Sequence, residues 1–304
     1  MGQEGALGED FGLSIRQGTV ITLSGIGYNL YRLISEEGGD NSGLRTRLVY
    51  RAKHQGMTET RSILGISFFT GNLVELVEKM VTQRGLLLAP SAPALVTIRS
   101  APAYRDALLE ADTVITDSSF MVLIWNTFER DSIPRISGLR YLRSLVNRPE
   151  VRQSGKTFWV MASPLSAKRN LDWLAMIGIR VPPECVYVAP MYGPTIEDPV
   201  LLEQIRAVRP DHIIVTLGGM TQERLGLYLK RRLDYVAGIH CIGAAIAFLS
   251  GDQVRIPTWA DRMYMGWLFR ACSNPRAYAP RYWQALKLAS LILRYRSKLP
   301  PLLT

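Results

Sequence analysis

The sequence is poor in the residues that bind metals or form disulfides. Its 304 residues contain three histidines and three cysteines, scattered along the chain. Three widely spaced cysteines (Cys185, Cys241 and Cys272) do not make a disulfide framework and favour a reducing compartment. Neither residue type shows the spacing of a metal site, so we expect no bound metal and no cofactor.

Long apolar runs are also lacking. No run reaches the roughly 18 residues that a membrane-spanning helix needs. The best candidate, residues 285–293, is short and interrupted by Lys287. Glu4, Glu9 and Asp10 lie where a secretory signal needs positive charge. These absences predict a cytoplasmic protein.

Acidic residues are missing from the end of the chain, although the net charge is +10 overall. After Asp261 the only charged residues are basic: Arg262, Arg270, Arg276, Arg281, Lys287, Arg294, Arg296 and Lys298. Such charge beside aromatic and leucine residues suits nucleic acid or an anionic membrane surface. The chain shows no nucleic-acid-binding motif, so we predict a membrane partner; the alternative is a basic helix that only faces solvent.

Apolar residues recur at near-helical spacing within the same basic segment. They are Leu286, Leu288, Leu291, Ile292 and Leu293. This spacing predicts an amphipathic helix whose apolar face enters the membrane interface.

Hydrophobic residues are abundant, at 47% of the sequence, and 20% of the residues are charged. This composition suits a globular protein with a substantial core. From Met57 onward, strand and helix patterns alternate. Strands are predicted at 86–88, 113–116, 157–161, 186–188, 213–217 and 235–242. Helices are predicted at 73–80, 103–110, 119–128, 138–146, 164–177 and 200–208. This alternation predicts an α/β fold: a Rossmann-like, mostly parallel sheet with flanking helices.

The same patterns divide the chain into three parts. Residues 1–56 lack clear periodicity, and we predict a poorly ordered N-terminal extension. Residues 57–254 form the predicted core. Residues 255–304 form a basic, helical C-terminal appendage that is expected to complete the active site and contact the membrane.

Small residues follow two of the predicted strands. Gly218 and Gly219 follow strand 213–217, and Gly243 follows strand 235–242. Open α/β sheets bind ligands at the carboxyl ends of adjacent strands. Glycine turns of this kind permit close backbone approach, although many α/β proteins have them.

From about residue 60 onward, the ordered set of features resembles the bacterial WecG/TagA/CpsF glycosyltransferases. The matching residues are Leu217, Gly218, Gln222, Glu223, Gly243, Phe248, Leu249, Gly251, Arg255, Pro257, Trp259, Trp267, Leu268, Arg270, Pro275 and Arg276. Members of that family move a sugar from a nucleotide donor to a polyprenyl-diphosphate-linked acceptor at the membrane. The resemblance implies an inverting, metal-independent enzyme of surface or exopolysaccharide synthesis, with a UDP-sugar donor.

The resemblance places the catalytic base at Asp117, which matches a strand-end Asp-Gly motif with Ser118 in place of glycine. The alternative is that Asp117 only caps the following helix, for which Ser118 is also a good N-cap. Ser91 stands where the family has the Asn of Thr-Pro-Asn, and it is expected to contact substrate.

The resemblance also predicts the substrate-binding residues. Gln222 matches a family residue whose amide offers donors and an acceptor to a sugar or diphosphate, and Glu223 follows it. The alternative is an exposed first turn of a helix at 221–223. Gly218 and Gly243 are expected to approach the donor. The diphosphate is expected to meet Arg255, Arg270, Arg276 and Arg281, because the chain has no Asp-x-Asp motif for a metal.

Several family positions differ. Met220 and Thr221 replace Pro and Lys, Ala247 replaces an Asp, and Gly266 replaces a Glu. Either the donor sugar differs or activity is lost. Two other functions therefore stay open. One is a dehydrogenase, against which the missing G-x-G-x-x-G motif counts. The other is a non-catalytic, membrane-associated subunit of a polysaccharide assembly complex.

The predicted partners are a nucleotide-sugar donor, a polyprenyl-diphosphate-linked acceptor and an anionic membrane surface, without nucleic acid. The expected place is the inner face of the cell membrane, as a peripheral protein. Whether the chain forms a homo-oligomer stays open.

Overall fold

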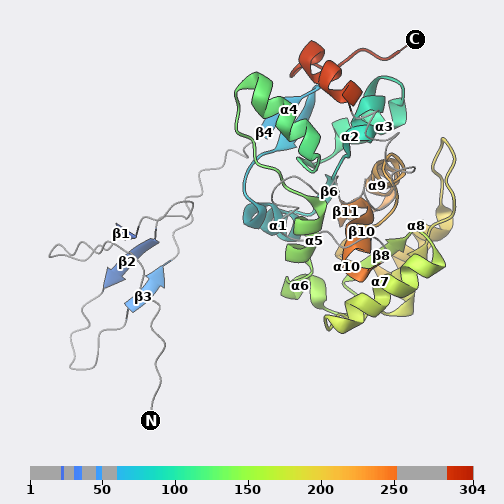
Figure 1. Ribbon diagram of the computed structural model, residues 1–304. Helices are drawn as coiled ribbons and strands as arrows, with labels where there is room; N and C mark the ends of the chain where they lie inside the picture. The colour runs from blue at the N-terminus through green and yellow to red at the C-terminus, as the bar shows by residue number, and fades with distance from the viewer. Residues whose placement is uncertain (1–21, 24–30, 36–45, 50–59, 252–285, 304) are drawn as a thin grey trace. The chain divides into compact units, whose positions relative to one another are not determined.

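The structure is a computed structural model that describes residues 22–23, 31–35, 46–49, 60–251 and 286–303 (Figure 1). The chain divides into two compact units, Met1–Met57 and Thr58–Thr304. In the first unit, β1 (Thr22–Leu23), β2 (Tyr31–Ser35) and β3 (Thr46–Val49) form an antiparallel sheet. The sequence did not predict these strands, because residues 1–56 show no clear periodicity.

Eight strands of the second unit form one sheet, in the order β4-β5-β7-β6-β11-β10-β8-β9. They are β4 (Thr60–Ile63), β5 (Ile66–Phe69), β6 (Gly85–Leu88), β7 (Thr113–Ile115), β8 (Thr157–Met161), β9 (Val186–Val188), β10 (His212–Val215) and β11 (Gly238–Cys241). Neighbours pair in parallel except β4 and β5, which form an antiparallel hairpin. The predicted α/β fold with a mostly parallel sheet is confirmed.

Helices cover both faces of this sheet, and each face has its own core. The first face packs against α2 (Ala92–Leu95), η1 (Val96–Arg99), α3 (Pro102–Glu110), α4 (Ser119–Glu129), α8 (Pro199–Val208), α9 (Thr221–Arg232) and helical residues 286–295. The second face packs against α1 (Leu73–Thr82), α5 (Gly138–Leu145), α6 (Pro149–Arg152), α7 (Pro164–Met176), η3 (Gly243–Ala245) and α10 (Ala247–Ser250). A short η2 (Pro183–Cys185) precedes β9.

Burial on both faces explains why the strands are almost continuously apolar. In β6, Leu86 and Leu88 enter the first core, while Leu87 enters the second. Successive side chains of a strand point to opposite faces, so a parallel strand covered on both sides needs apolar residues throughout.

Strands β6 and β11 are neighbours in the sheet, and the chain continues from them onto opposite faces of the sheet. β6 continues into α2 and α3 on the first face, and β11 continues into η3 and α10 on the second. Such a topological switch point leaves a crevice outside the carboxyl ends of the strands. The fold therefore places a ligand site beyond Leu88 and Cys241.

Two element predictions were wrong in detail. β11 begins at Gly238, three residues after the predicted start at Tyr235, because residues 234–235 form a bend before the strand. The β4–β5 hairpin was not predicted. Its two turn residues, Leu64 and Gly65, both have positive φ (53° and 76°), the geometry of a tight hairpin turn.

The described end of the chain is part of the second unit's fold. Leu288 and Ile292 are 0% exposed in the first core. The backbone N–H groups of Leu64 and Gly65 donate to the carbonyls of Arg296 and Ser297. The expectation that the whole apolar stripe faces a membrane is therefore wrong for Leu288 and Ile292.

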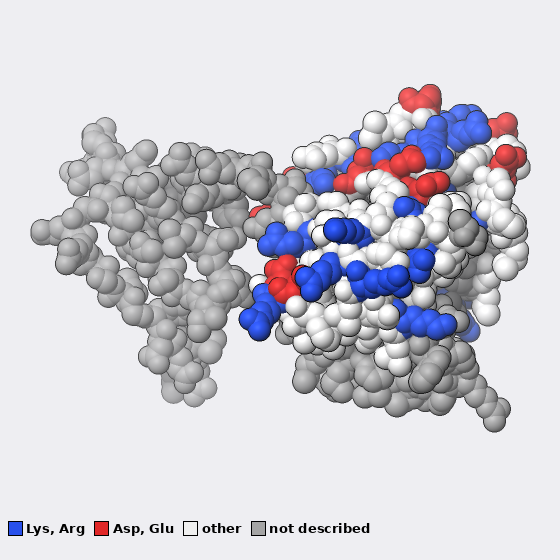
Figure 2. All heavy atoms as spheres, turned by 90° about the horizontal axis from the view of Figure 1, so that it is seen from above, with Lys and Arg blue, Asp and Glu red and all other residues white. Residues whose placement is uncertain are grey.

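Basic side chains remain on the outside of this segment. Lys287, Arg294, Arg296 and Lys298 are all exposed. Figure 2 shows Lys and Arg side chains spread over this side of the molecule, with acidic side chains among them. Of the helices in the described residues, none is long and apolar enough to cross a bilayer.

Candidate functional site

Three strand ends and the start of α5 meet at the switch point. A side-chain carbon added at Gly138, the first residue of α5, would lie 3.8 Å from the Ala89 side chain and 3.3 Å from the Ile242 carbonyl oxygen. These residues follow β6 and β11. After β10, a carbon added at Gly219 would lie 3.5 Å from Ser91 Oγ. Residues that follow three different strands are thus within contact distance of one another.

Asp117, two residues after β7, lies at this edge and is half-buried. Its Oδ1 accepts a hydrogen bond from the backbone N–H of Gly138 at 2.9 Å. Its Oδ2 has no hydrogen-bond partner among the described residues. The α4 cap is Ser118, whose Oγ accepts from the N–H of Met121, so Asp117 is not needed for that role.

A buried hydrogen bond fastens α5 to β11. Tyr141 Oη and His240 Nδ1 are 2.7 Å apart, and His240 Nε2 lies 3.2 Å from Nδ1 of His212. Burial lowers the pKa of both imidazoles, to about 4 for His212, so both are neutral at neutral pH. This contact begins one turn after Gly138 and therefore helps to place the N–H that holds Asp117.

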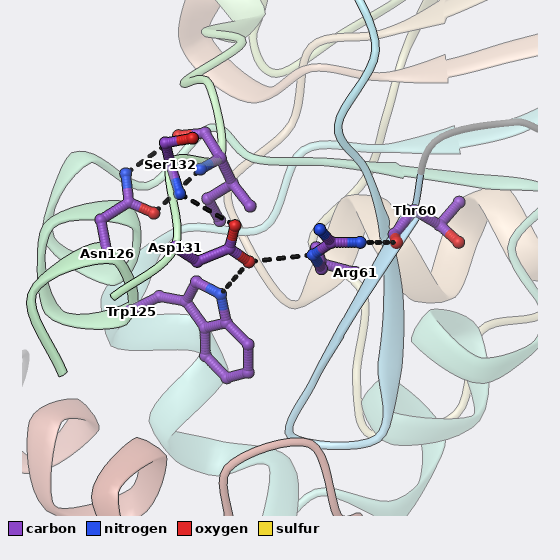
Figure 3. A network of polar contacts seen from close by, with 7 residues as sticks. Thr60, Arg61, Trp125, Asn126, Asp131 and Ser132 are labelled. Carbon is purple, nitrogen blue, oxygen red and sulfur yellow. Dashed lines mark hydrogen bonds and ion pairs between the residues drawn. The ribbon is translucent and has the colours of Figure 1, made fainter. Parts of the chain in front are cut away.

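Arg135 lies next to Asp117, although the sequence had not singled it out. Its Nε donates to the Asp117 carbonyl oxygen at 3.0 Å. The loop that carries it follows α4 and is held by the network in Figure 3. The Asp131 carboxylate accepts from three donors there: Arg61 Nε, Trp125 Nε1 and the Ser132 N–H. The Asn126 side chain exchanges two hydrogen bonds with the Ile133 backbone.

A cavity of about 200 Å³ lies beside Arg135. Its lining residues are Gly71, Asn72, Leu73, Pro134, Arg135, Ile136 and Arg140. The guanidinium-bearing side chains of Arg135 and Arg140 are both part of its lining. Spacing and periodicity do not distinguish Arg135 and Arg140 from the other basic residues, so only the fold reveals their position.

Gln222 joins helix α9 to the turn after β11. Its Oε1 accepts from the Gly243 N–H at 2.5 Å, and its Nε2 donates to Glu223 Oε1 at 3.3 Å. Gly243 has φ of +61°, a conformation that favours glycine. Gln222 is 2% exposed and Glu223 0% exposed, so the alternative of an exposed helical turn at 221–223 is wrong.

Glu223 is buried because α9 lies very close to the sheet. A side-chain carbon at Gly226 would lie 2.5 Å from Cys241 Sγ and 2.7 Å from the Leu86 side chain. Burial raises the pKa of Glu223 to about 7. Its Oε2 has no hydrogen-bond partner within the described residues.

The structure brings together six of the predicted site residues at one sheet edge: Ser91, Asp117, Gly218, Gln222, Glu223 and Gly243. Gly218 is exposed, with open space around the position of a side chain. The predicted Arg255, Arg270, Arg276 and Arg281 lie outside the described residues, as does Gly266. The described residues contain no group of three His, Cys, Asp or Glu placed for a metal.

A larger cavity, of about 640 Å³, lies at the other end of the strands, where β6 begins. Its basic side chains already have partners within the protein. Lys79 donates to Thr113 Oγ1, Arg84 pairs with Asp211, and Lys230 pairs with Asp112. We therefore assign the functional site to the carboxyl-end edge.

Comparison with known proteins identifies the family of the chain. The model of the glycosyl transferase WecG/TagA/CpsF family matches residues 61–301. The chain belongs to this family. One relative is the N-acetylglucosaminyldiphosphoundecaprenol N-acetyl-beta-D-mannosaminyltransferase of Bacillus spizizenii, 21% identical over 229 residues, which cover 71% of this chain and 84% of the relative. Membership confirms the predicted glycosyltransferase.

Proposed function

We propose that this glycosyltransferase moves a sugar from a nucleotide donor, expected to be a UDP-sugar, to a polyprenyl-diphosphate-linked saccharide, with inversion. One observation carries the proposal: Asp117 is held on one carboxylate oxygen by Gly138 at the switch point, and the other oxygen lacks a described partner. The relative from Bacillus spizizenii, named for an acceptor on diphosphoundecaprenol, supports the acceptor class.

Asp117 is the proposed general base. As the acceptor oxygen attacks the anomeric carbon, its proton passes to Asp117 Oδ2. The new carbon–oxygen bond forms on the face opposite the nucleotide. The bond to the diphosphate breaks, and its electron pair leaves with the diphosphate. The Gly138 N–H fixes the orientation of the carboxylate during this step.

Arginine side chains are proposed to balance the negative charge of the donor's phosphates. Arg135 and Arg140 line the small cavity, and Arg135 Nε also donates to the Asp117 carbonyl oxygen. Guanidinium groups are suited to phosphate oxygens, so these two arginines are proposed to lie near the diphosphate. Arg255, Arg270, Arg276 and Arg281 are proposed to offset the charge that develops on the leaving group, in the place of a metal ion.

The donor is proposed to lie against the glycine turns. Gly218 leaves open space, Ser91 offers a hydroxyl, and Gln222 holds the Gly243 turn in place. The replacements at Thr221, Ala247 and Gly266 are proposed to change the preferred sugar. The pathway is proposed to build a surface or exopolysaccharide at the inner face of the membrane.

Asp117→Asn tests the base. With the preferred nucleotide sugar and a lipid-diphosphate acceptor, kcat should fall by roughly 100-fold or more, because asparagine cannot take the proton. The KM of the donor should change little. Asp172→Asn, an exposed aspartate on α7, is the matched control and should behave as wild type. Near-normal kcat in Asp117→Asn would remove Asp117 from the mechanism.

Activity should persist in EDTA. Arginines supply the positive charge in the proposed mechanism, so chelation removes nothing that the transfer step needs. Initial rates with excess EDTA should match those with added Mg²⁺ or Mn²⁺. A rate that disappears in EDTA and returns with metal would show that a metal ion holds the diphosphate.

A further inference from the structure

Glu223 lies behind the site, inside the protein. Its side chain is 0% exposed, although Gln222 and Gly243 beside it belong to the candidate site. We propose that Glu223 is a positioning residue: its carboxylate sets the orientation of the Gln222 amide and, through that amide, the position of the Gly243 turn. This inference rests on the proposed function, which places the donor against that turn.

The Gln222 amide has two orientations that exchange its oxygen and nitrogen. In the observed one, Oε1 faces the Gly243 N–H and Nε2 faces Glu223 Oε1. In the reverse orientation, the amide NH₂ would face the Gly243 N–H, placing donor against donor. The amide oxygen would face the Glu223 carboxylate, placing acceptor against acceptor. Only the observed orientation satisfies both neighbours, so the carboxylate and the backbone N–H determine it together.

This orientation limits what Gln222 can offer a ligand. A glutamine amide has two N–H donors and an oxygen with two lone pairs. One donor is used by Glu223 and one lone pair by Gly243. One N–H and one lone pair remain for a sugar hydroxyl or a phosphate oxygen. If the amide turned over, the Gly243 turn would lose its anchor.

The protonation state of Glu223 changes near neutral pH. Burial raises its pKa to about 7, opposed by hydrogen bonds from the backbone of Glu223, the Gln222 side chain and the backbone of Met220, and by the Arg224 charge. Tyr104 of α3 and Cys241 of β11 face the carboxyl, and their own pKa values are raised by burial, which keeps them neutral. Arg224 itself donates to the carbonyls of Met220 and Gly193.

The sign of the pH effect follows from these groups. Above pH 7 Glu223 is a carboxylate, and below pH 7 it is protonated. A hydrogen bond to a charged acceptor is roughly twice as strong as one to a neutral acceptor. The Gln222 amide, and with it the Gly243 turn, is therefore held more firmly above pH 7 than below it.

Nuclear magnetic resonance of the full 15N-labelled chain tests the coupling without any substrate. Between pH 5.5 and 8.5 the Gly243 amide signal should shift with a midpoint near 7. In Glu223→Gln that shift should be absent, since glutamine cannot titrate. The Gly155 amide, in a turn before β8, is the control and should not follow this midpoint. A Gly243 signal that does not titrate, or that titrates equally in Glu223→Gln, overturns the proposal.

Transfer kinetics provide the second readout. In wild type, kcat/KM should fall several-fold as the pH falls from 8 to 6, and Glu223→Gln should give the lower value at both pH values. In a Gln222→Met background, Glu223→Gln should have no further effect, because the amide is gone. A full additional loss there would show a structural role and overturn the positioning role.

The two arms separate this inference from the proposed function. If no nucleotide sugar is transferred but Gly243 titrates with Glu223, the positioning contact stands and the proposed function fails. If sugar is transferred and neither readout responds to Glu223→Gln, the proposed function stands and the inference is wrong.

Discussion

Two carboxyl groups at the same sheet edge have opposite surroundings. Asp117 is half-buried and accepts a backbone N–H, while Glu223 is fully buried with one oxygen unpartnered among the described residues. Different surroundings give two carboxyls different tasks. The half-buried Asp117 suits proton transfer with a substrate, and the fully buried Glu223 suits control of its neighbour Gln222.

Glu223→Gln should change stability in a pH-dependent way. The carboxyl has a pKa of 4.5 in the unfolded chain and about 7 in the folded one. Between these values the folded state binds more protons, so wild type loses stability as the pH rises from 4.5 to 7. The free energy of unfolding of the neutral variant, taken relative to wild type, should therefore be on the order of 3 kcal/mol higher at pH 8 than at pH 4.

Urea unfolding of both proteins at pH 4 and pH 8 measures this difference. Asp172→Asn, which removes an exposed carboxylate on α7, is the matched control. A Glu223→Gln difference that is the same at both pH values would mean that the carboxyl is not titrating in the folded interior.

Helix α9 contributes Gln222 and Glu223 to the candidate site and packs them beside β11. Its closest approach is at Gly226, where a methyl group would meet Cys241 Sγ and Leu86 well inside contact distance. Gly226→Ala should therefore lower the free energy of unfolding by about 1–3 kcal/mol, through displacement of the helix.

The same variant should also weaken transfer, because the displaced helix moves Gln222 away from Gly243. Gly193→Ala is the matched control, because its neighbourhood is open and its φ is not positive. Thermal unfolding and kcat/KM measure the two effects. Loss of stability with unchanged kcat/KM would show that the Gly243 turn does not depend on α9.

Periodic apolar runs made most elements of the second unit predictable, because burial on both faces requires them. α4 and its Ser118 cap, β8 and β9 agree with the expected ranges within a residue. The β4–β5 hairpin was not predicted, since its first strand is polar and three of its four residues are exposed. Arg135 was not predicted either, because its contact with Asp117 depends on the Asp131 network.

The site shows the same division. Asp117, Gln222 and Gly243 were singled out through the family resemblance, which depends on motifs at strand ends, and their roles stay predictions. The burial of Glu223 could not be predicted, because it follows from the close packing at Gly226 between elements distant in sequence.

At the scale of the whole molecule, the C-terminal segment has a buried apolar side and an exposed basic side. Leu288 and Ile292 pack in the core, while Lys287, Arg294, Arg296 and Lys298 stay exposed. Removing residues 285–304 would take away core residues as well as charge. Deletion is therefore a poor test of membrane binding, and exchange of exposed charges is a better one.

Arg294→Glu with Lys298→Glu should weaken binding to anionic vesicles without unfolding the protein. Each basic residue near such a surface contributes about 1 kcal/mol, and this attraction is screened by salt. Reversing two charges should lower the vesicle partition coefficient by at least about tenfold at low salt. Co-sedimentation with phosphatidylserine vesicles measures the effect, and the wild-type protein should be released as salt rises.

The matched control reverses two exposed charges elsewhere: Arg180→Glu, after α7, with Arg232→Glu, at the end of α9. Both double variants lower the net charge by the same amount. If the C-terminal segment faces the membrane, only the first should lose binding. Equal loss in both would mean that vesicles sense the overall charge of +10 and not this segment. Leu286, Leu293, Leu302 and Leu303 are also exposed in this segment, so equal loss would further mean that the attraction is mainly electrostatic and does not depend on these apolar side chains.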